Sequence, residues 1–270
     1  MRIIDAHVHL GNNRQTKYYS LRELRRDLKE AGAQGAVVFA FPEDIYRKLD
    51  SPAYRLEANN YVLEVADGSE NLCLYPFYFV WNDYILKAAK DAGKLYPFYF
   101  VWNDYLIPPN LDEYAGIKWH RHWNEPRYDY DNPKCAEVLE RIEGLEMPVV
   151  LEEEYVETLH FVEKNPEVKV IIPHMGKLNG GCDRMEAFFD NPNVYFDTST
   201  APLEAIRRIL DRVGAGRIIF GSDVSGTREP FYNFPKVELK KVLQLDLDEA
   251  GKELIFARNI EGLMARWISG

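Results

Sequence analysis

Short apolar runs alternate along this chain with longer segments whose apolar residues recur at helical spacing. Residues 2–10 form one such run, and residues 20–32 follow with Leu21, Leu24 and Leu28 on one helical face and a closing glycine. Strands that are apolar on both faces are typical of parallel sheets covered by helices. The alternation therefore predicts an α/β fold built on a parallel sheet.

The number of predicted strands narrows the fold further. Counting one repeated segment once, the strands are residues 2–10, 35–41, 95–105 (or its copy 74–84), 116–122, 148–153, 168–174, 193–199 and 217–223. The clearest intervening helices are predicted over residues 20–32, 53–67, 132–145 and 202–214. Eight parallel strands, each followed by a helix, is the number that a closed barrel of about 250 residues needs. We therefore expect residues 1–270 to form a single (β/α)8 TIM-like barrel domain.

The segment LYPFYFVWNDY occurs twice, at 74–84 and at 95–105. Residues 58–66 resemble residues 81–89, so the repeated unit is a helix plus a strand. A barrel of eight strands has no ordinary place for a ninth, because strand number, tilt and shear are linked. We expect the second copy to form the third strand, since it leads directly into the fourth. The other copy is either a tolerated tandem duplication or an added pocket wall or homodimer contact.

Charge and composition exclude several classes of protein. The net charge of −10 argues against a nucleic-acid surface, which needs an excess of Lys and Arg. There is no apolar run of transmembrane length and no leader-like N-terminus. Cys73, Cys135 and Cys182 are an odd number without framework spacing. These features favour a cytoplasmic protein that acts on a small molecule rather than on nucleic acid or a membrane.

Polar residues with metal-binding or catalytic chemistry gather at the ends of the predicted strands. His7 and His9 are two residues apart on one strand, so both imidazoles should project inward beside Asp5. The carboxyl ends of barrel strands converge on one place, where barrel enzymes carry their active sites. Imidazoles and carboxylates together suit Zn²⁺ or a similar divalent cation. The later predicted strands end with His120, Glu152, His174 and Asp223.

The motifs DAHVHL, GIKWH, PHMG and FGSD, in this order and each at a strand end, resemble the amidohydrolase superfamily. The resemblance is to its amidohydrolase-related branch, which includes aminocarboxymuconate-semialdehyde decarboxylase and several lactonases and hydrolases. It spans the chain from Ile3 to the C-terminal helices, and it implies a β/α barrel with one or two divalent metals. It also implies that His7 and His9 are metal ligands, that Asp223 binds metal and takes a proton from metal-bound water, and that His174 contacts substrate or helps activate water.

One strand departs from the pattern of that branch. Where many relatives read PVLIHTG, with a histidine ligand, this chain reads MPVVLEEEY, and Glu152 takes the place of the histidine. Glutamate is a competent oxygen ligand, and it would admit Mn²⁺, Fe²⁺ or Ni²⁺ as well as Zn²⁺. Glu153 has the opposite strand parity and should face the helices, and Glu154 should lie in the loop or the first helical turn.

Four further residues are candidates for substrate binding. Lys118 shares strand parity with His120, and it could contact a substrate carboxylate, bridge metals as a carbamate or form a structural ion pair. His120 could contact substrate. Trp102 and Asn103, just past the third strand, are candidates for the pocket rim.

Other polar residues have two open interpretations. Asp197 and Thr198 end the seventh strand and either reach the pocket or cap the next helix. Arg121 and His122 either line an anion site or are surface charges, and for Arg127 the surface interpretation is preferred. His160, in a predicted helix, is expected to be a surface or packing residue.

The predicted function is metal-dependent hydrolysis of a small ester, lactone or amide by metal-activated water. One alternative is non-oxidative decarboxylation of a small unsaturated or aromatic acid in the same site. A third, of another class, is a catalytically inactive barrel that serves as a binding or structural protein.

Overall fold

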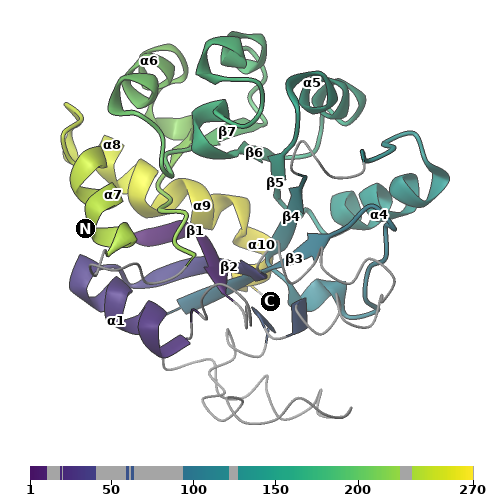
Figure 1. Cartoon of the computed structure of the whole chain (residues 1–270), viewed down its shortest axis with the longest axis horizontal. Coiled ribbons are helices and arrows are strands. Elements are labelled where there is room, and N and C mark those ends of the chain that lie inside the picture. The colour runs from purple at the N-terminus through teal and green to yellow at the C-terminus, as the bar shows by residue number, and fades with distance from the viewer. Residues whose placement is uncertain are drawn as a thin grey trace.

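The structure is a computed structural model that describes residues 1–10, 19, 21–40, 59–60, 62–63, 94–121, 127–225 and 233–269. Its eight strands are parallel and follow one another in chain order around one sheet, with helices outside it (Figure 1). The strands are β1 (Ile4–Leu10), β2 (Gly35–Ala40), β3 (Lys94–Val101), β4 (Gly116–His120), β5 (Val149–Glu152), β6 (Val170–Ile172), β7 (Val194–Asp197) and β8 (Ile218–Ile219). The helices are α1 (Leu21–Ala31), α4 (Pro133–Gly144), α5 (Tyr155–Lys164), α6 (Leu203–Val213), α7 (Phe234–Val242), α8 (Glu249–Glu253), α9 (Asn259–Leu263) and α10 (Ala265–Ser269).

The first strand and the segment after the last strand bring the two ends of the sheet together. Ala6 N donates to Phe220 O at 2.9 Å, and Asp223 N donates to the carbonyl of His7 at 2.9 Å. A side chain at position 221 would place its Cβ 2.9 Å from His7 Cβ, so only glycine allows this close approach. The prediction of a (β/α)8 barrel is therefore confirmed, and the sheet closes where His7 and Asp223 meet.

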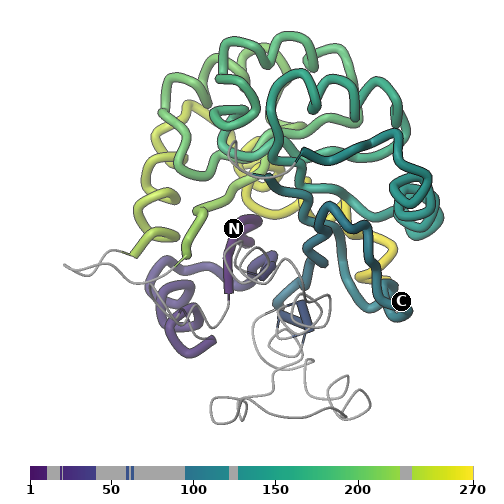
Figure 2. The backbone as a smooth tube through the Cα atoms, turned by 45° about the vertical axis from the view of Figure 1, so that its right-hand side comes forward, coloured from purple at the N-terminus to yellow at the C-terminus, as the bar shows by residue number. Residues whose placement is uncertain are grey.

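Two apolar clusters lie on opposite sides of the sheet. The inner cluster takes Ile4 and Ala6 from β1, Phe39 from β2, and residues from the other strands. Residues of α9 join it, including Ile260, so the C-terminal helices cover one end of the barrel (Figure 2). The larger outer cluster packs the helices on the sheet. Because the inner cluster fills the barrel below, the polar strand ends lie at the other end of the strands, as barrel enzymes require.

The second copy of the repeated segment forms β3, as predicted, and the first copy lies outside the described residues. Residues 59–60 and 62–63, within the helix predicted at 53–67, are helical. The Asn59 amide donates to Phe100 O at 3.0 Å and accepts from Phe100 N, so this helix is tied to β3. Gly116 leaves room inside the barrel for the Phe98 ring, which a Cβ would meet at 2.5 Å.

Two of the strands stop before the functional residue that was predicted to end them. β6 stops at Ile172, and His174 lies in a 3-10 turn with a φ of 56°. β8 is only two residues long, and Asp223 has a φ of 59°. Left-handed residues cannot continue a strand, so both functional side chains lie in turns beyond the sheet rather than on it.

No helix in the described ranges is both long enough and apolar enough to cross a bilayer. Cys135 and Cys182 are free thiols, and Cys73 lies outside the described residues.

Candidate functional site

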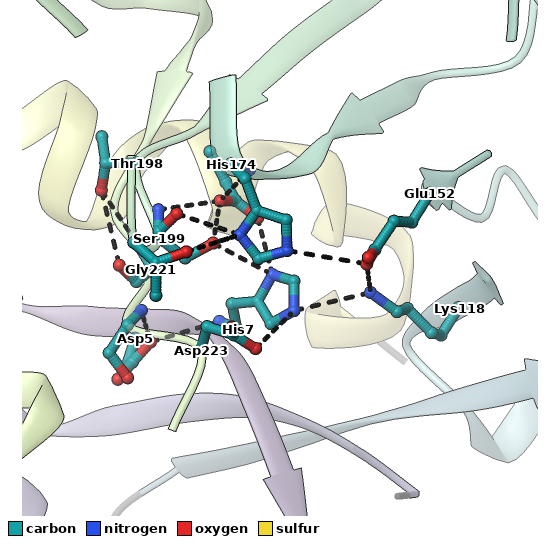
Figure 3. A network of polar contacts seen from close by, with 12 residues as sticks. Asp5, His7, Lys118, Glu152, His174, Thr198, Ser199, Gly221 and Asp223 are labelled. Carbon is teal, nitrogen blue, oxygen red and sulfur yellow. Dashed lines mark hydrogen bonds and ion pairs between the residues drawn. The ribbon is translucent and has the colours of Figure 1, made fainter. Parts of the chain in front are cut away.

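His7, His9 and Asp223 meet at the carboxyl end of β1. Asp223 Oδ1 lies 3.5 Å from His7 Nε2 and 3.5 Å from His9 Nε2 (Figure 3 shows His7 and Asp223). Both imidazoles are buried, whereas the Asp223 side chain is 30% exposed. Asp223 is therefore the member of this group that faces outward.

The other ring nitrogen of each histidine faces an oxygen atom. His7 Nδ1 lies 2.7 Å from Asp197 Oδ2, and His9 Nδ1 lies 3.2 Å from the carbonyl oxygen of Ala40. A carbonyl or a carboxylate accepts a proton, so each Nδ1 is assigned as the donor and each Nε2 keeps its lone pair. Burial, followed by the charge of Lys118, lowers the pKa of His7 to about 4, which keeps that imidazole neutral at pH 7. Three acceptor atoms thus face one another, and a cation between them would stabilise the arrangement.

Asp5 does not share the inward face with the two histidines. Ile4 and Ala6 belong to the inner cluster, and the pairing of β1 with β2 shifts register after Asp5. The Asp5 carboxylate accepts instead from the backbone of Ser222 at 2.8 Å and of His7 at 3.2 Å. The expectation that the imidazoles project beside Asp5 is therefore wrong, because an irregularity breaks the alternation of β1 between them.

Asp197 reaches the site rather than capping a helix. Its Oδ2 holds His7, and its Oδ1 accepts from the backbone N–H groups of His174 at 3.0 Å and Ser199 at 2.9 Å. Burial opposes ionisation of Asp197, but the neighbouring His7 and His174 lower its pKa overall. Thr198 lies between the ends of β7 and β8, where Gly221 N donates to its hydroxyl at 3.3 Å. Asp197 therefore orients one imidazole and the turn that carries another.

His174 is held as a cation. Its Nδ1 lies 3.0 Å from the carbonyl oxygen of Ser199, and its Nε2 lies 3.6 Å from Glu152 Oε2 (Figure 3). Burial favours the neutral ring, but the hydrogen bond and charge of Glu152 raise the pKa of His174 to about 9. An imidazolium has no lone pair, so His174 donates a proton in this arrangement and would bind a metal only after giving that proton up.

Glu152 is surrounded by donors. Lys118 Nζ lies 3.0 Å from Oε2, and His120 Nε2 lies 3.1 Å from Oε1. Burial would raise the pKa of Glu152, but the charges of His120 and Lys118 hold it well below its usual range. Of the three interpretations of Lys118, the distances support the ion pair, which Lys118 forms with Glu152. Whether Glu152 binds a metal stays a prediction.

Three site residues were not singled out from the sequence. The Phe39 ring lies edge-on to both imidazoles of β1, with centroids 5.0 Å from His7 and 4.6 Å from His9. Ser199 Oγ and Thr200 Oγ1 lie 2.9 Å and 3.2 Å from His174 Nδ1. Two features of the sequence could have identified them. Residues 37 and 39 of β2 point into the barrel because side chains alternate along a strand, and several hydroxyl residues follow β7.

Backbone conformation marks the same region independently. His174, Met175, Thr200 and Asp223 all have positive φ, which costs a residue other than glycine on the order of 1–3 kcal/mol. Such residues persist where the surroundings determine them, and they cluster at functional sites.

Other predicted residues lie away from this group. Arg121 and Glu153 are buried together behind the strands, which confirms that Glu153 faces the helices. Arg121 is therefore a buried ion-pair partner, and its interpretation as a surface charge is wrong. Glu154 is the N-cap residue of α5, and Arg127, 70% exposed, lies 3.4 Å from it. His160 is a surface residue whose side chain is 44% exposed.

Trp102 and Asn103 are the two residues proposed for the pocket rim. Trp102 is buried in the outer cluster with its ring against Tyr128, so it packs the helix layer. Asn103 is half-buried. Their predicted contacts with substrate stay untested, and His122 lies outside the described residues.

Among the described residues, His7, His174 and Asp223 each offer an atom within 4.8 Å of the others, close enough to surround one metal ion. His9 borders the same group through Asp223. Two nitrogen donors and a carboxylate on one side suit a first-row divalent cation.

Solved structures with the same fold cover almost all of this chain. A candidate 2-pyrone-4,6-dicarboxylic acid hydrolase from Pseudomonas putida is 15% identical, with 98% of each chain covered and a TM-score of 0.68. The 2,6-dihydroxybenzoate decarboxylase from Rhizobium is 12% identical, with 100% of this chain and 99% of that chain covered and a TM-score of 0.66. The 5-carboxyvanillate decarboxylase from Sphingomonas paucimobilis is 10% identical, with 98% and 99% covered and a TM-score of 0.64. At these identities the likeness shows the fold.

No curated protein sequence matches this chain. A family model does: residues 111–263, more than half of the chain, match the model described as amidohydrolase. That segment includes Glu152, His174 and Asp223. The chain therefore belongs to the amidohydrolase family.

Proposed function

We propose that this protein is a metal-dependent hydrolase of a small ester, lactone or amide. The observation that carries the proposal is the meeting of His7 Nε2, His9 Nε2 and Asp223 Oδ1, with both separations from Asp223 at 3.5 Å. Two ligand atoms about 2.1 Å from one tetrahedral ion lie about 3.4 Å apart, so each of the two imidazoles is placed to share an ion with Asp223. The nitrogen-rich set favours Zn²⁺, and the carboxylate would also accept Mn²⁺, Fe²⁺ or Ni²⁺.

His7, His9 and Asp223 would hold the cation, which supplies Lewis acidity toward a substrate carbonyl and toward water. Asp223, the exposed member, is placed to accept a proton from the attacking water. His174, charged beside Glu152, is placed to donate a proton to the leaving group. Asp197 keeps His7 in the tautomer whose Nε2 lone pair faces the site.

Decarboxylation of a small acid is the second candidate, because two of the similar structures are decarboxylases. The two reactions differ in their products. A hydrolase opens a lactone, ester or amide without releasing CO₂, whereas a decarboxylase releases one CO₂ for each acid consumed.

The test is elemental analysis of the purified protein after loading with Zn²⁺ or Mn²⁺, beside an Asp223→Asn variant. We expect about one ion per chain in the wild type and loss of at least 100-fold in metal affinity in the variant, since a charged ligand is removed. Asp211→Asn, on the exposed side of α6, is the matched control and should bind like the wild type. A screen of lactones, esters and carboxylic acids with CO₂ detection then assigns the reaction. If the wild type binds no metal and converts none of these substrates, the proposal is wrong, and the interpretation as a catalytically inactive barrel is the one that remains.

A further inference from the structure

Lys118 lies inside the barrel in direct contact with the candidate metal ligands. It is fully buried, and its Nζ lies 3.0 Å from Glu152 Oε2 and 3.5 Å from His7 Nε2 (Figure 3). The ammonium also lies 4.8 Å from the centre of the Phe39 ring. A cation belonging to the protein itself therefore faces the same lone pair of His7 that a metal would use.

Glu152 is the counter-ion of this lysine. Lys118 and His174 face its Oε2, and His120 faces its Oε1, so nitrogen donors approach both carboxylate oxygens. The β4–β5 register supports this arrangement, because His120 pairs with Glu152 and Lys118 with Val150 on adjacent strands. The carboxylate is thus held by two groups of β4 and by His174.

Moving Glu152 onto a metal would break this ion pair. A buried ammonium without its carboxylate is strongly unfavourable, and here it would lie beside a divalent cation of the same sign. The loss of the carboxylate falls only on the complex in which Glu152 is a ligand, because the Lys118–Glu152 pair stays intact when His7, His9 and Asp223 bind the ion.

We propose that Lys118 withholds Glu152 from the metal, so that this site binds its ion through His7, His9 and Asp223 and Glu152 becomes a ligand only when Lys118 is removed. The inference rests on the proposed metal site. It makes Lys118 the residue that sets the coordination number and the strength of metal binding. The inference also explains why a glutamate stands where many relatives have a histidine. The ammonium of Lys118 pairs with the carboxylate of Glu152, and it could not form such an ion pair with a histidine.

The experiment is a double-mutant cycle of wild type, Lys118→Met, Glu152→Gln and the double variant, titrated with Co²⁺ against a competing chelator. The visible absorption of bound Co²⁺ reports the set of ligands and does not depend on turnover. We expect Glu152→Gln to keep the wild-type spectrum and to weaken binding by about 10- to 100-fold at most, as for a group outside the ligand shell. We expect Lys118→Met to bind more tightly, with a changed spectrum.

In the Lys118→Met background, Glu152→Gln should cost about 100-fold or more and restore the wild-type spectrum, because a ligand is then lost. Arg127→Met, which removes a positive charge from the surface, is the control and should behave as the wild type. Circular dichroism establishes that each variant is folded, and the Glu152→Gln spectrum remains a test if Lys118→Met does not fold.

The outcomes separate this inference from the proposed function. A Glu152→Gln spectrum that differs from the wild type, or an equal cost of Glu152→Gln in both backgrounds, would overturn the inference while leaving a metal enzyme. Binding by Lys118→Met but not by the wild type would also overturn the inference, because the three residues His7, His9 and Asp223 would then not hold an ion without Glu152. Absence of Co²⁺ binding in every protein of the cycle would overturn both.

Discussion

Two neighbouring glutamates, one the last residue of β5 and the other just beyond it, each form a buried ion pair on opposite sides of the sheet, with one residue of β4 and the residue that follows β4. Glu152 pairs with Lys118 inside the barrel at 3.0 Å, and Glu153 pairs with Arg121 outside it, where Arg121 Nε lies 2.8 Å and 3.0 Å from its two carboxylate oxygens. The alternation of side chains along a strand sends the two carboxylates in opposite directions. The same chemistry therefore serves the site on one face and the packing of helices on the other.

The surroundings of the two pairs differ more than the pairs themselves. The inner carboxylate has His120 and His174 as further partners besides Lys118, and the pKa of His174 is raised to about 9. The outer carboxylate accepts from Tyr130 and from the backbone of Glu154, beside a guanidinium that stays charged. We expect the outer pair to act as a fixed clamp and the inner pair to respond to pH and to metal.

The largest effect on stability should come from breaking the outer pair. Arg121→Met leaves Glu153 buried without its cation, and removal of one partner of a buried pair costs about 3–5 kcal/mol. Urea denaturation measures the loss in the free energy of unfolding. Metal content per folded molecule should stay at the wild-type level, because this pair faces the helices.

Lys118→Met is the matched change on the inner side. His120 and His174 remain as donors to Glu152, so we expect it to destabilise the protein less than Arg121→Met does. If Lys118→Met lowers the free energy of unfolding more than Arg121→Met does, the inner pair and not the outer pair is the main stabilising ion pair.

The next effect is a pH dependence confined to the inner pair. The pKa of His174 is raised from 6.5 to about 9, so the folded protein binds more protons than the unfolded chain between these values. Its contribution to stability is therefore complete below pH 6.5 and is lost as the pH rises through 9, a change of about 3 kcal/mol. Urea denaturation of the metal-free protein between pH 6.5 and 9.5 measures it.

Glu152→Gln removes the hydrogen bond and the charge that raise this pKa. Its free energy of unfolding should lose the downward slope over the same pH range, whatever its absolute value. An unchanged slope would mean that Glu152 does not hold the proton on His174.

The sequence predicted the parts of this comparison that depend on strand periodicity. The opposite directions of Glu152 and Glu153 follow from a period of two residues, and the inward placement of Lys118 with His120 follows in the same way. The eight-strand barrel followed from the alternation of strands and helices. The motifs at the strand ends located the site for the same reason, because parallel strands converge at their carboxyl ends.

What the sequence could not predict depends on departures from regular strands and on long-range contacts. Asp5 was misplaced because β1 changes register before His7, and no residue type signals that change. His174 and Asp223 lie in left-handed turns beyond short strands, so their directions follow from the turns and not from parity. The choice of Glu152 as the partner of Lys118 depends on a distance across two strands, and a long flexible side chain has several partners within reach.

The smallest expected effect is the contribution of one hydrogen bond to the outer ion pair. The hydroxyl of Tyr130 donates to Glu153 Oε2 at 3.2 Å, while the guanidinium of Arg121 engages both oxygens of the same carboxylate. Tyr130→Phe keeps the ring, which packs against Trp119 and Phe161, and removes only this hydrogen bond. Because Glu153 keeps its cation and the backbone donor, we expect a loss of about 1.5 kcal/mol in the free energy of unfolding, at the low end for a bond to a charged group. A loss as large as that of Arg121→Met would show that the hydroxyl, and not the guanidinium, is what makes burial of this carboxylate tolerable.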